Sequence, residues 1–166
     1  RIPLSGESFA VDAIDGLSFT AIPVTGKAPP YSPHRNDAHI GDNIGIKIVE
    51  VSTGKSVFYA PGLGEITDET RQLMSESDCL LVDGTFWSEN EMQKVGLGNK
   101  LASDMGHLPQ SGKGGMLEVL RPTKKPRKIL IHINNTNPIL NEESEQRLKV
   151  VAEGIEVAYD GMEVEL

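Results

Sequence analysis

The sequence is poor in cysteine and in long apolar stretches. Its 166 residues include a single cysteine, Cys79, so no disulfide can form within the chain. Disulfide-stabilised scaffolds are therefore excluded, and a reducing, cytoplasmic location is expected. Cys79 begins an apolar run, where a buried structural thiol is more common than a nucleophile. No apolar run is long enough to span a membrane, so membrane insertion is not expected.

Basic residues are also scarce relative to acidic ones. The chain has 16 Lys and Arg against 24 Asp and Glu, and its formal net charge is −8. Nucleic acids and anionic membranes bind clustered Lys and Arg, so neither is an expected partner. One local basic run, in a proline-containing stretch before a strand, is interpreted as a solvated loop: Lys124, Lys125, Arg127 and Lys128.

The start of the chain lacks a methionine. Arg1 stands there instead, no signal peptide is visible, and the sequence opens directly on a strand-like run. We therefore expect a piece of a longer polypeptide. Its length still suffices for one domain with a sizeable core, and 38% hydrophobic and 24% charged residues are typical of globular proteins.

Hydrophobic patterning predicts a mixed α/β fold. Two hairpins come first, one around Asp15-Gly16 within residues 8–24, the other joining strands 44–51 and 56–60. Between them, residues 25–43 are rich in Pro, Gly and His and predict a long functional loop. Strand–helix alternation then follows. The expected strands are 79–83, 128–133 and one after 154; the expected helices are 65–77 with Thr67 as N-cap, 114–121, and a helix from Asn141 to Gly154.

Polar side chains end two of the apolar strands. Asp83 follows LLV and His132 follows ILI. Ligands gather at strand ends in layered α/β folds, and a carboxylate with an imidazole suits zinc or non-haem iron. Each residue also has a structural interpretation, because Asp before Gly often makes a turn and a lone His is often a core residue. The pattern alone leaves both interpretations open.

His107 lies in the loop GHLPQSGKGGM, between the Asp83 and His132 strands. An imidazole there could serve as a general acid or base or hydrogen-bond a substrate, or it could simply be an exposed loop residue. The glycines of this loop lack the full spacing of a phosphate-binding loop, so nucleotide binding is only weakly indicated.

The other two histidines, His34 and His39, share the long loop. Their spacing is that of a same-face helical pair, but Pro33 and the surrounding turn residues disfavour a helix, so a shared metal is not expected. Asn134, Asn135, Thr136 and Asn137 follow the His132 strand. Turn formation is their more common role, and substrate binding is the alternative.

Several segments together resemble a known family. LLVDGTFW, DMGHLPQSG, ILIHINNTNPIL and AYDGME occur in the order found in the C-terminal half of the metallo-β-lactamase superfamily. KAPPYSPHR and GDNIGI extend the resemblance to the PqqB family, which serves pyrroloquinoline quinone (PQQ) biosynthesis, over nearly the whole chain. The resemblance implies a single metallo-β-lactamase-like domain, an αββα sandwich, of which residues 1–166 would form about the second half, the N-terminal half being absent.

The resemblance also implies a site. Asp83 and His132 would be metal ligands, and His107 would lie over the metal and handle a proton. Substrate-binding residues are expected among Asn134, Asn135, Thr136, Ser111 and Lys27. Two departures stand out: the His-x-His-x-Asp-His motif and the cysteine-rich segment are absent, and Thr25-Gly26-Lys27 stands where many relatives carry a further His ligand. A one-metal centre is therefore expected, with weak binding from this chain alone.

For function, the resemblance implies an oxygenase that hydroxylates a tyrosine-derived PQQ precursor, with iron as the working metal and O2 as co-substrate. Zinc could bind but has no accessible redox step. The expected partners are PQQ or its precursor, other PQQ-biosynthesis proteins and a second copy in a homodimer. Two alternatives remain. One is a carrier that assists transport of PQQ or its precursor to the periplasm. The other is a metallo-hydrolase of the phosphodiesterase type, which the negative charge and the single metal disfavour.

Overall fold

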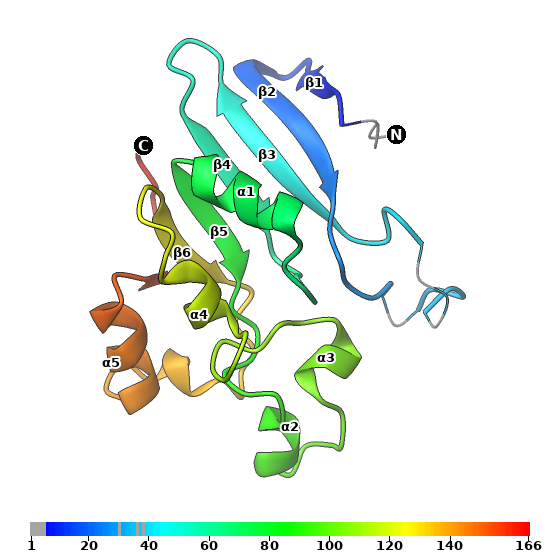
Figure 1. Cartoon of the computed structure of the whole chain (residues 1–166), viewed down its shortest axis with the longest axis vertical. Helices are drawn as coiled ribbons and strands as arrows, with labels where there is room; N and C mark the ends of the chain where they lie inside the picture. The colour runs from blue at the N-terminus through cyan, green and yellow to red at the C-terminus, as the bar shows by residue number, and fades with distance from the viewer. Residues whose placement is uncertain (1–5, 30, 36, 38) are drawn as a thin grey trace.

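The computed structural model describes residues 6–29, 31–35, 37 and 39–166 (Figure 1). The prediction of a longer polypeptide rested on Arg1, which lies outside the described residues. So do Pro30, Asn36 and Ala38 of the predicted long loop. Among the helices of the described part, none combines enough length and apolar character to cross a membrane.

Seven strands form one sheet in the order of the sequence. They are β1 (Ser8–Val11), β2 (Ile14–Pro23), β3 (Ile44–Glu50), β4 (Ser56–Ala60), β5 (Cys79–Asp83), β6 (Arg127–Ile131) and β7 (Glu156–Val157). Strands β1 to β4 pair antiparallel, and β4 to β7 pair parallel. Short turns join β1 to β2 and β3 to β4, and the long loop joins β2 to β3, whereas the parallel pairs are joined by crossovers. The mixed α/β prediction is confirmed.

The crossover segments carry the helices. These are α1 (Asp68–Glu76), α2 (Glu91–Lys94), α3 (Ala102–Met105), α4 (Met116–Leu120), the 3-10 helix η1 (Pro138–Leu140) and α5 (Glu145–Ala152). Helix α1 begins as predicted, since the Thr67 hydroxyl accepts a hydrogen bond from the Thr70 amide at 3.2 Å. Figure 1 shows α1 and α4 in front of the parallel strands.

The core lies between the parallel strands and these helices. Its buried side chains come from β4 to β7, α1, α4, η1 and α5: Phe58, Met74, Leu80, Val82, Met116, Leu117, Leu120, Leu130, Ile139, Val150 and Val157. Alternation along β4 shows the two faces, because Phe58 is fully buried whereas its neighbour Tyr59 is 38% exposed. Cys79 is buried as predicted, and burial raises the pKa of its thiol, which keeps it protonated and unreactive.

The first hairpin does not turn where the sequence predicts. Val11 pairs with Ile14, so the turn is Asp12-Ala13, and Asp15-Gly16 lies inside β2. Gly16 has φ +78° and its carbonyl accepts from the Val51 amide at 2.9 Å, just before β2 begins to pair with β3. A glycine with positive φ inside a strand marks a local irregularity. The Asp15-Gly16 pair therefore corresponds to an irregularity within β2 and not to the hairpin turn.

Two further boundaries differ from the predictions. Strand β6 ends at Ile131, so His132 follows the strand and does not belong to it. The last helix begins at Glu145 and not near Asn141, because the Ser144 hydroxyl caps it by accepting from the Arg147 amide at 3.1 Å. Pro138 starts the separate 3-10 turn that occupies the expected first turn of the helix.

Candidate metal centre

The segments after β5 and β6 lie against each other at the carboxyl ends of the parallel strands. The Gly84 amide donates to the Ile131 carbonyl at 2.8 Å, and the Asn134 amide donates to the Thr85 carbonyl at 3.1 Å. Gly84 makes the approach possible, because an added Cβ would lie 2.6 Å from Ile133 Cδ1 and 2.9 Å from Leu130 Cβ. Asp83 and His132 are thereby held at neighbouring strand ends, where layered folds place ligands.

Asp83 is fully buried, with hydrogen bonds to both carboxylate oxygens. Its Oδ2 accepts from the Leu63 amide at 2.9 Å and from His107 Nδ1 at 2.7 Å. Its Oδ1 accepts from the amide and the hydroxyl of Thr85 at 2.9 and 2.6 Å. A buried carboxylate needs such donors to offset the loss of water. The contacts join the end of β5 to the segment after β4 and to the His107 loop.

Thr85 determines which nitrogens of the two histidines remain free. Its Oγ1 lies 2.6 Å from Asp83 Oδ1, 2.8 Å from His132 Nδ1 and 3.1 Å from His107 Nδ1. The Thr85 hydroxyl donates to the Asp83 carboxylate, so its oxygen can accept from His132 Nδ1, whereas His107 Nδ1 donates to Asp83 Oδ2. An imidazole that donates from Nδ1 leaves its Nε2 lone pair available to a metal.

His107 follows α3 and packs by its edge on an aromatic ring. The ring centroids of His107 and Phe86 are 5.8 Å apart at 72°, and the neighbouring Leu108 amide donates to the Leu63 carbonyl at 2.6 Å. The His107 side chain is 17% exposed. Its imidazole is therefore held on one side by Asp83 and on the other by Phe86.

His132 has an unusual backbone. Its φ is +57°, and it is the sole non-glycine residue with positive φ in the described part of the chain. That conformation costs a residue with a Cβ roughly 1–2 kcal/mol and persists only where the surroundings enforce it. Here the hydrogen bonds of Gly84 and Thr85 to the flanking Ile131 and Asn134 enforce it. In this conformation His132 Nδ1 lies 2.8 Å from Thr85 Oγ1.

Asp83, His107 and His132 each offer a donor atom within 4.8 Å of the others. Imidazole and carboxylate are the ligand types of many non-haem iron sites, and zinc accepts the same ligands. The donor chemistry of these residues therefore suits a metal of this class. Exposure rises from buried Asp83 through His107 to exposed His132, so the cluster opens on the His132 side.

Two hollows flank the open side. One, of about 600 Å³, is lined by residues that include His132, Asn135, Arg147 and Tyr159. The other, of about 440 Å³, is lined by residues that include Lys27, Arg35, Tyr59, His107 and His132. Volumes of this size suit a small organic ligand.

The predicted substrate-binding residues fall into two groups. Asn135 and Lys27 line the hollows, although Lys27 Nζ also donates to the Asp104 carbonyl at 2.8 Å. The other three side chains bind within the protein. Ser111 donates to the Trp87 carbonyl at 2.6 Å, Thr136 to Glu91 Oε1 at 2.5 Å, and Asn134 Nδ2 to Thr136 Oγ1 at 2.5 Å. Their roles toward substrate stay predictions.

Sequence reasoning missed Thr85 and the framing role of Asn137. Buried Asn137 donates from Nδ2 to the carbonyls of Gly84 and Thr85, at 3.0 and 3.2 Å, and its Oδ1 accepts from the Ile139 amide. Thr85 could have been found from its position two residues after Asp83, since an Asp side chain in a turn bonds the backbone two residues on. The turn interpretation of the asparagine-rich segment fits Asn137.

Comparison with known proteins identifies the family. A sequence model of the β-lactamase superfamily domain matches residues 2–133, which is most of the chain. The chain belongs to the β-lactamase superfamily. Within this superfamily it is 58% identical over 159 residues to a "Coenzyme PQQ synthesis protein B" of Nitrosococcus oceani, covering 96% of this chain and 52% of that protein. A protein of the same name from Pseudomonas entomophila is 54% identical over 166 residues, with 100% and 54% covered.

Two solved structures share the fold of this chain. The crystal structure of Zn²⁺-bound PqqB from Methylobacterium extorquens matches with a TM-score of 0.88 and 33% identity, over 97% of this chain and 54% of that one. A diphosphatase of the PhnP family matches with a TM-score of 0.56 and 16% identity, over 97% of this chain and 47% of that one, which shows the fold alone. The chain thus spans about half the length of the curated relatives it matches. The resemblance noted in the sequence is confirmed.

Proposed function

We propose that the protein acts in PQQ biosynthesis, where its metal centre oxidises a tyrosine-derived precursor. The observation that carries the proposal is the cluster of two imidazoles and one buried carboxylate, Asp83, His107 and His132, at the ends of β5 and β6. The pathway is inferred from relatives that are named for PQQ synthesis and that match nearly the whole chain. The activity, substrate and partners of the whole protein belong to this proposal.

Iron is the metal we propose, since with this ligand set it supplies O2-dependent oxidation, which zinc cannot. Asp83 and His132 are the two metal ligands from this chain, with Thr85 keeping the His132 proton on Nδ1. His107, tied to Asp83 through Nδ1, presents Nε2 to the open side, where it moves a proton of the substrate.

The 600 Å³ hollow beside His132 is the proposed place for the precursor. Arg147 in its wall gives one N–H to the Ile139 carbonyl at 3.0 Å. A guanidinium has five N–H donors, so others can hold a carboxylate of an amino-acid-derived molecule. Tyr159 and Asn135 supply an aromatic ring and an amide for the rest of the precursor.

The test uses the full-length protein, loaded with Fe²⁺ without oxygen and mixed with a tyrosine-derived precursor. Hydroxylation on admission of O2 and a reductant puts one oxygen atom into the precursor and reduces the other to water, which mass spectrometry detects. His132→Ala is expected to abolish product. Leu97→Ala, at an exposed residue outside the cluster and both hollows, is the matched control and keeps it. An iron-loaded protein that leaves the precursor unoxidised contradicts the proposal.

A carrier is the second candidate, and the two hollows beside the cluster favour it. In that case the metal is structural, and PQQ or its precursor binds without being changed. Calorimetric titration with PQQ separates the two functions: tight binding in the absence of turnover supports the carrier. A cytoplasmic location, a homodimer and contacts with other PQQ-biosynthesis proteins stay predictions.

A further inference from the structure

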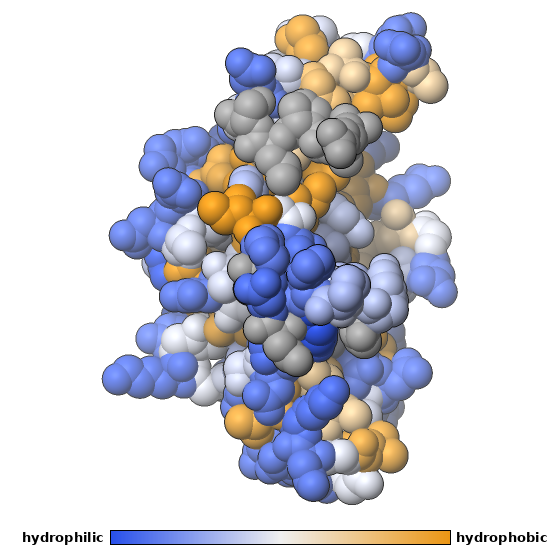
Figure 2. Space-filling model, turned by 90° about the vertical axis from the view of Figure 1, so that its right-hand side faces the viewer, coloured by the Kyte–Doolittle hydropathy of each residue, from blue (hydrophilic) through white to orange (hydrophobic). Residues whose placement is uncertain are grey.

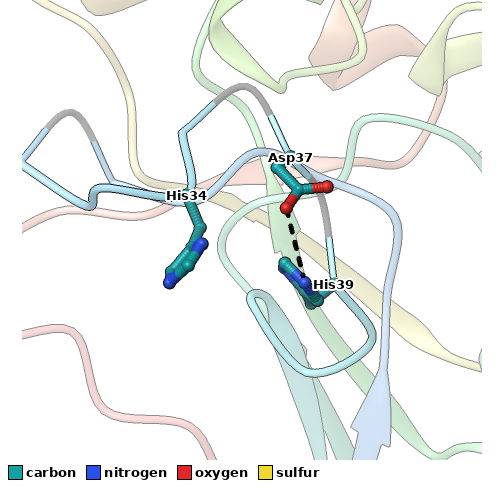
Figure 3. Close-up of side chains that lie close together, drawn as sticks. All are labelled: His34, Asp37 and His39. Atoms are coloured by element: carbon teal, nitrogen blue, oxygen red, sulfur yellow. Dashed lines mark ion pairs between the residues drawn. The ribbon is translucent and has the colours of Figure 1, made fainter.

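A second group of potential metal ligands lies in the loop between β2 and β3. His34, Asp37 and His39 each offer a donor atom, and all of these atoms lie within 4.8 Å of one another (Figure 3). From the sequence, a metal shared by His34 and His39 was not expected, because their spacing would place them on one face only in a helix and no helix was predicted. No helix forms in the described part of this loop, yet the two imidazole rings still meet edge to face, with centroids 5.2 Å apart.

A series of turns brings these side chains together. The Arg35 amide donates to the Ser32 carbonyl at 3.2 Å, the Asp37 amide to the His34 carbonyl at 3.0 Å, and the Asp42 amide to the His39 carbonyl at 3.1 Å. The Asp42 carboxylate accepts from the His39 amide at 2.8 Å. Backbone hydrogen bonds to described neighbours thus involve both His34 and His39.

The donor atoms of this group face solvent. The side chains of His39 and Asp37 are 56% and 78% exposed, and they form an ion pair of 3.6 Å. Figure 2 shows the molecule from the side on which this loop projects in Figure 1, and hydrophilic side chains gather over the middle of that face. Zinc binds imidazole nitrogen and carboxylate oxygen at about 2.0–2.2 Å. Exposed side chains can rotate among their rotamers to close around such an ion.

We propose that His34, Asp37 and His39 form a second metal site, distinct from the Asp83 cluster, that binds a borderline divalent cation of the zinc class. Two imidazoles and a carboxylate select zinc and its neighbours over calcium or magnesium, which prefer oxygen ligands. Water completes the coordination on the exposed side. The proposal is independent of the function of the Asp83 cluster, because the two groups share no residue.

The location gives this site a structural consequence. Lys27, Pro29 and Arg35 of the same loop line the hollow that also contains His107 and His132. Binding a cation at His34, Asp37 and His39 crosslinks the part of the loop that carries Arg35. We expect the bound ion to slow local opening of residues 25–43, one wall of that hollow.

The experiment is a Zn²⁺ titration of the full-length protein, followed by calorimetry and by elemental analysis after dialysis. His39→Ala and His34→Ala are each expected to lose about one equivalent of zinc per chain that the parent binds, because two remaining donors hold zinc poorly. Tyr31 lies in the same loop and is 89% exposed. Tyr31→Ala is therefore the matched control and is expected to keep this equivalent of zinc. His132→Ala also keeps this equivalent, which separates the loop site from the Asp83 cluster.

Hydrogen exchange supplies a second readout. Amides of residues 25–43 are expected to exchange more slowly with zinc in the parent protein and in Tyr31→Ala, but not in His39→Ala. Unchanged zinc stoichiometry in both His34→Ala and His39→Ala overturns the proposal. Loss of the same equivalent in His132→Ala also overturns it, since the ion would then belong to the Asp83 cluster.

Discussion

The four histidines of the chain divide into two clusters, each with one aspartate, and the clusters are built differently. Asp83, His107 and His132 come from three distant segments and meet around the hydroxyl of Thr85. The loop cluster of His34, Asp37 and His39 comes from a six-residue stretch and faces solvent. The first cluster depends on the fold for its geometry, whereas the second depends only on local turns.

This difference separates two demands on a metal site. A reactive centre needs defined tautomers and fixed ligand directions, and buried hydrogen bonds supply both at the Asp83 cluster. A site that only stabilises a loop needs donor atoms that can move to coordinate an ion. Exposed side chains supply such donors. Substitutions at the Asp83 cluster should therefore change stability and metal binding together, and those in the loop should change metal binding alone.

The largest effect is expected from Asp83→Ala. It leaves the Leu63 and Thr85 amides buried without an acceptor, at about 1–3 kcal/mol each. We expect the free energy of unfolding, measured by chemical denaturation, to fall by about 3–5 kcal/mol. Asp37→Ala is the control from the loop cluster and should change it by less than about 0.5 kcal/mol, as is usual for exposed positions. Equal losses in the two variants would contradict the distinction.

Gly84→Ala comes next. Its new Cβ would meet Ile133 Cδ1 at 2.6 Å, Leu130 Cβ at 2.9 Å and the Ile131 carbonyl at 3.0 Å. Forcing these apart should cost about 1–3 kcal/mol of unfolding free energy. Gly26→Ala in the loop meets chiefly the Asn43 side-chain amide at 2.6 Å, which can move, so it should cost less. Thermal unfolding of the two variants under one set of conditions gives the comparison.

Thr85→Val should weaken metal binding while preserving the fold. Valine has the shape of threonine but no hydroxyl to orient the His132 and His107 imidazoles. Loss of such an orienting hydrogen bond typically costs 10–100-fold in metal affinity, so we expect about that decrease in a chelator-competition assay. Thr85→Ser keeps the hydroxyl and should stay close to the parent. An equal decrease in the Val and Ser variants would mean that packing, and not the hydroxyl, sets the affinity.

The smallest effect concerns the backbone of His132. Glycine accepts a φ of +57° readily, so His132→Gly should be more stable than His132→Ala by about 1 kcal/mol. Both variants lose the metal ligand and the contact with Thr85, so the difference isolates the backbone strain. At His39, in the loop, the same Gly and Ala pair should show no such gain for glycine. Denaturant titration measures all four variants.

Much of the fold was predictable because a run of apolar residues indicates a buried strand from the local sequence alone. CLLVD at 79–83 and SVFYA at 56–60 form β5 and β4 at the predicted positions. The meeting of Asp83 and His132 was also expected, since neighbouring parallel strands end at one edge. Three features required the folded chain: the Gly16 irregularity in place of a turn, the end of β6 before His132, and the position of Thr85 between two histidines. Each depends on partners far away in the sequence.

The most direct test measures iron and zinc in the full-length protein, prepared without oxygen, for Asp83→Asn, His132→Ala and the double variant. If both residues hold one ion, each single variant loses the same equivalent and the double variant loses no more. That is the result the account predicts. Metal retained in both single variants, or an additional equivalent lost in the double variant, would show that Asp83 and His132 do not share a centre.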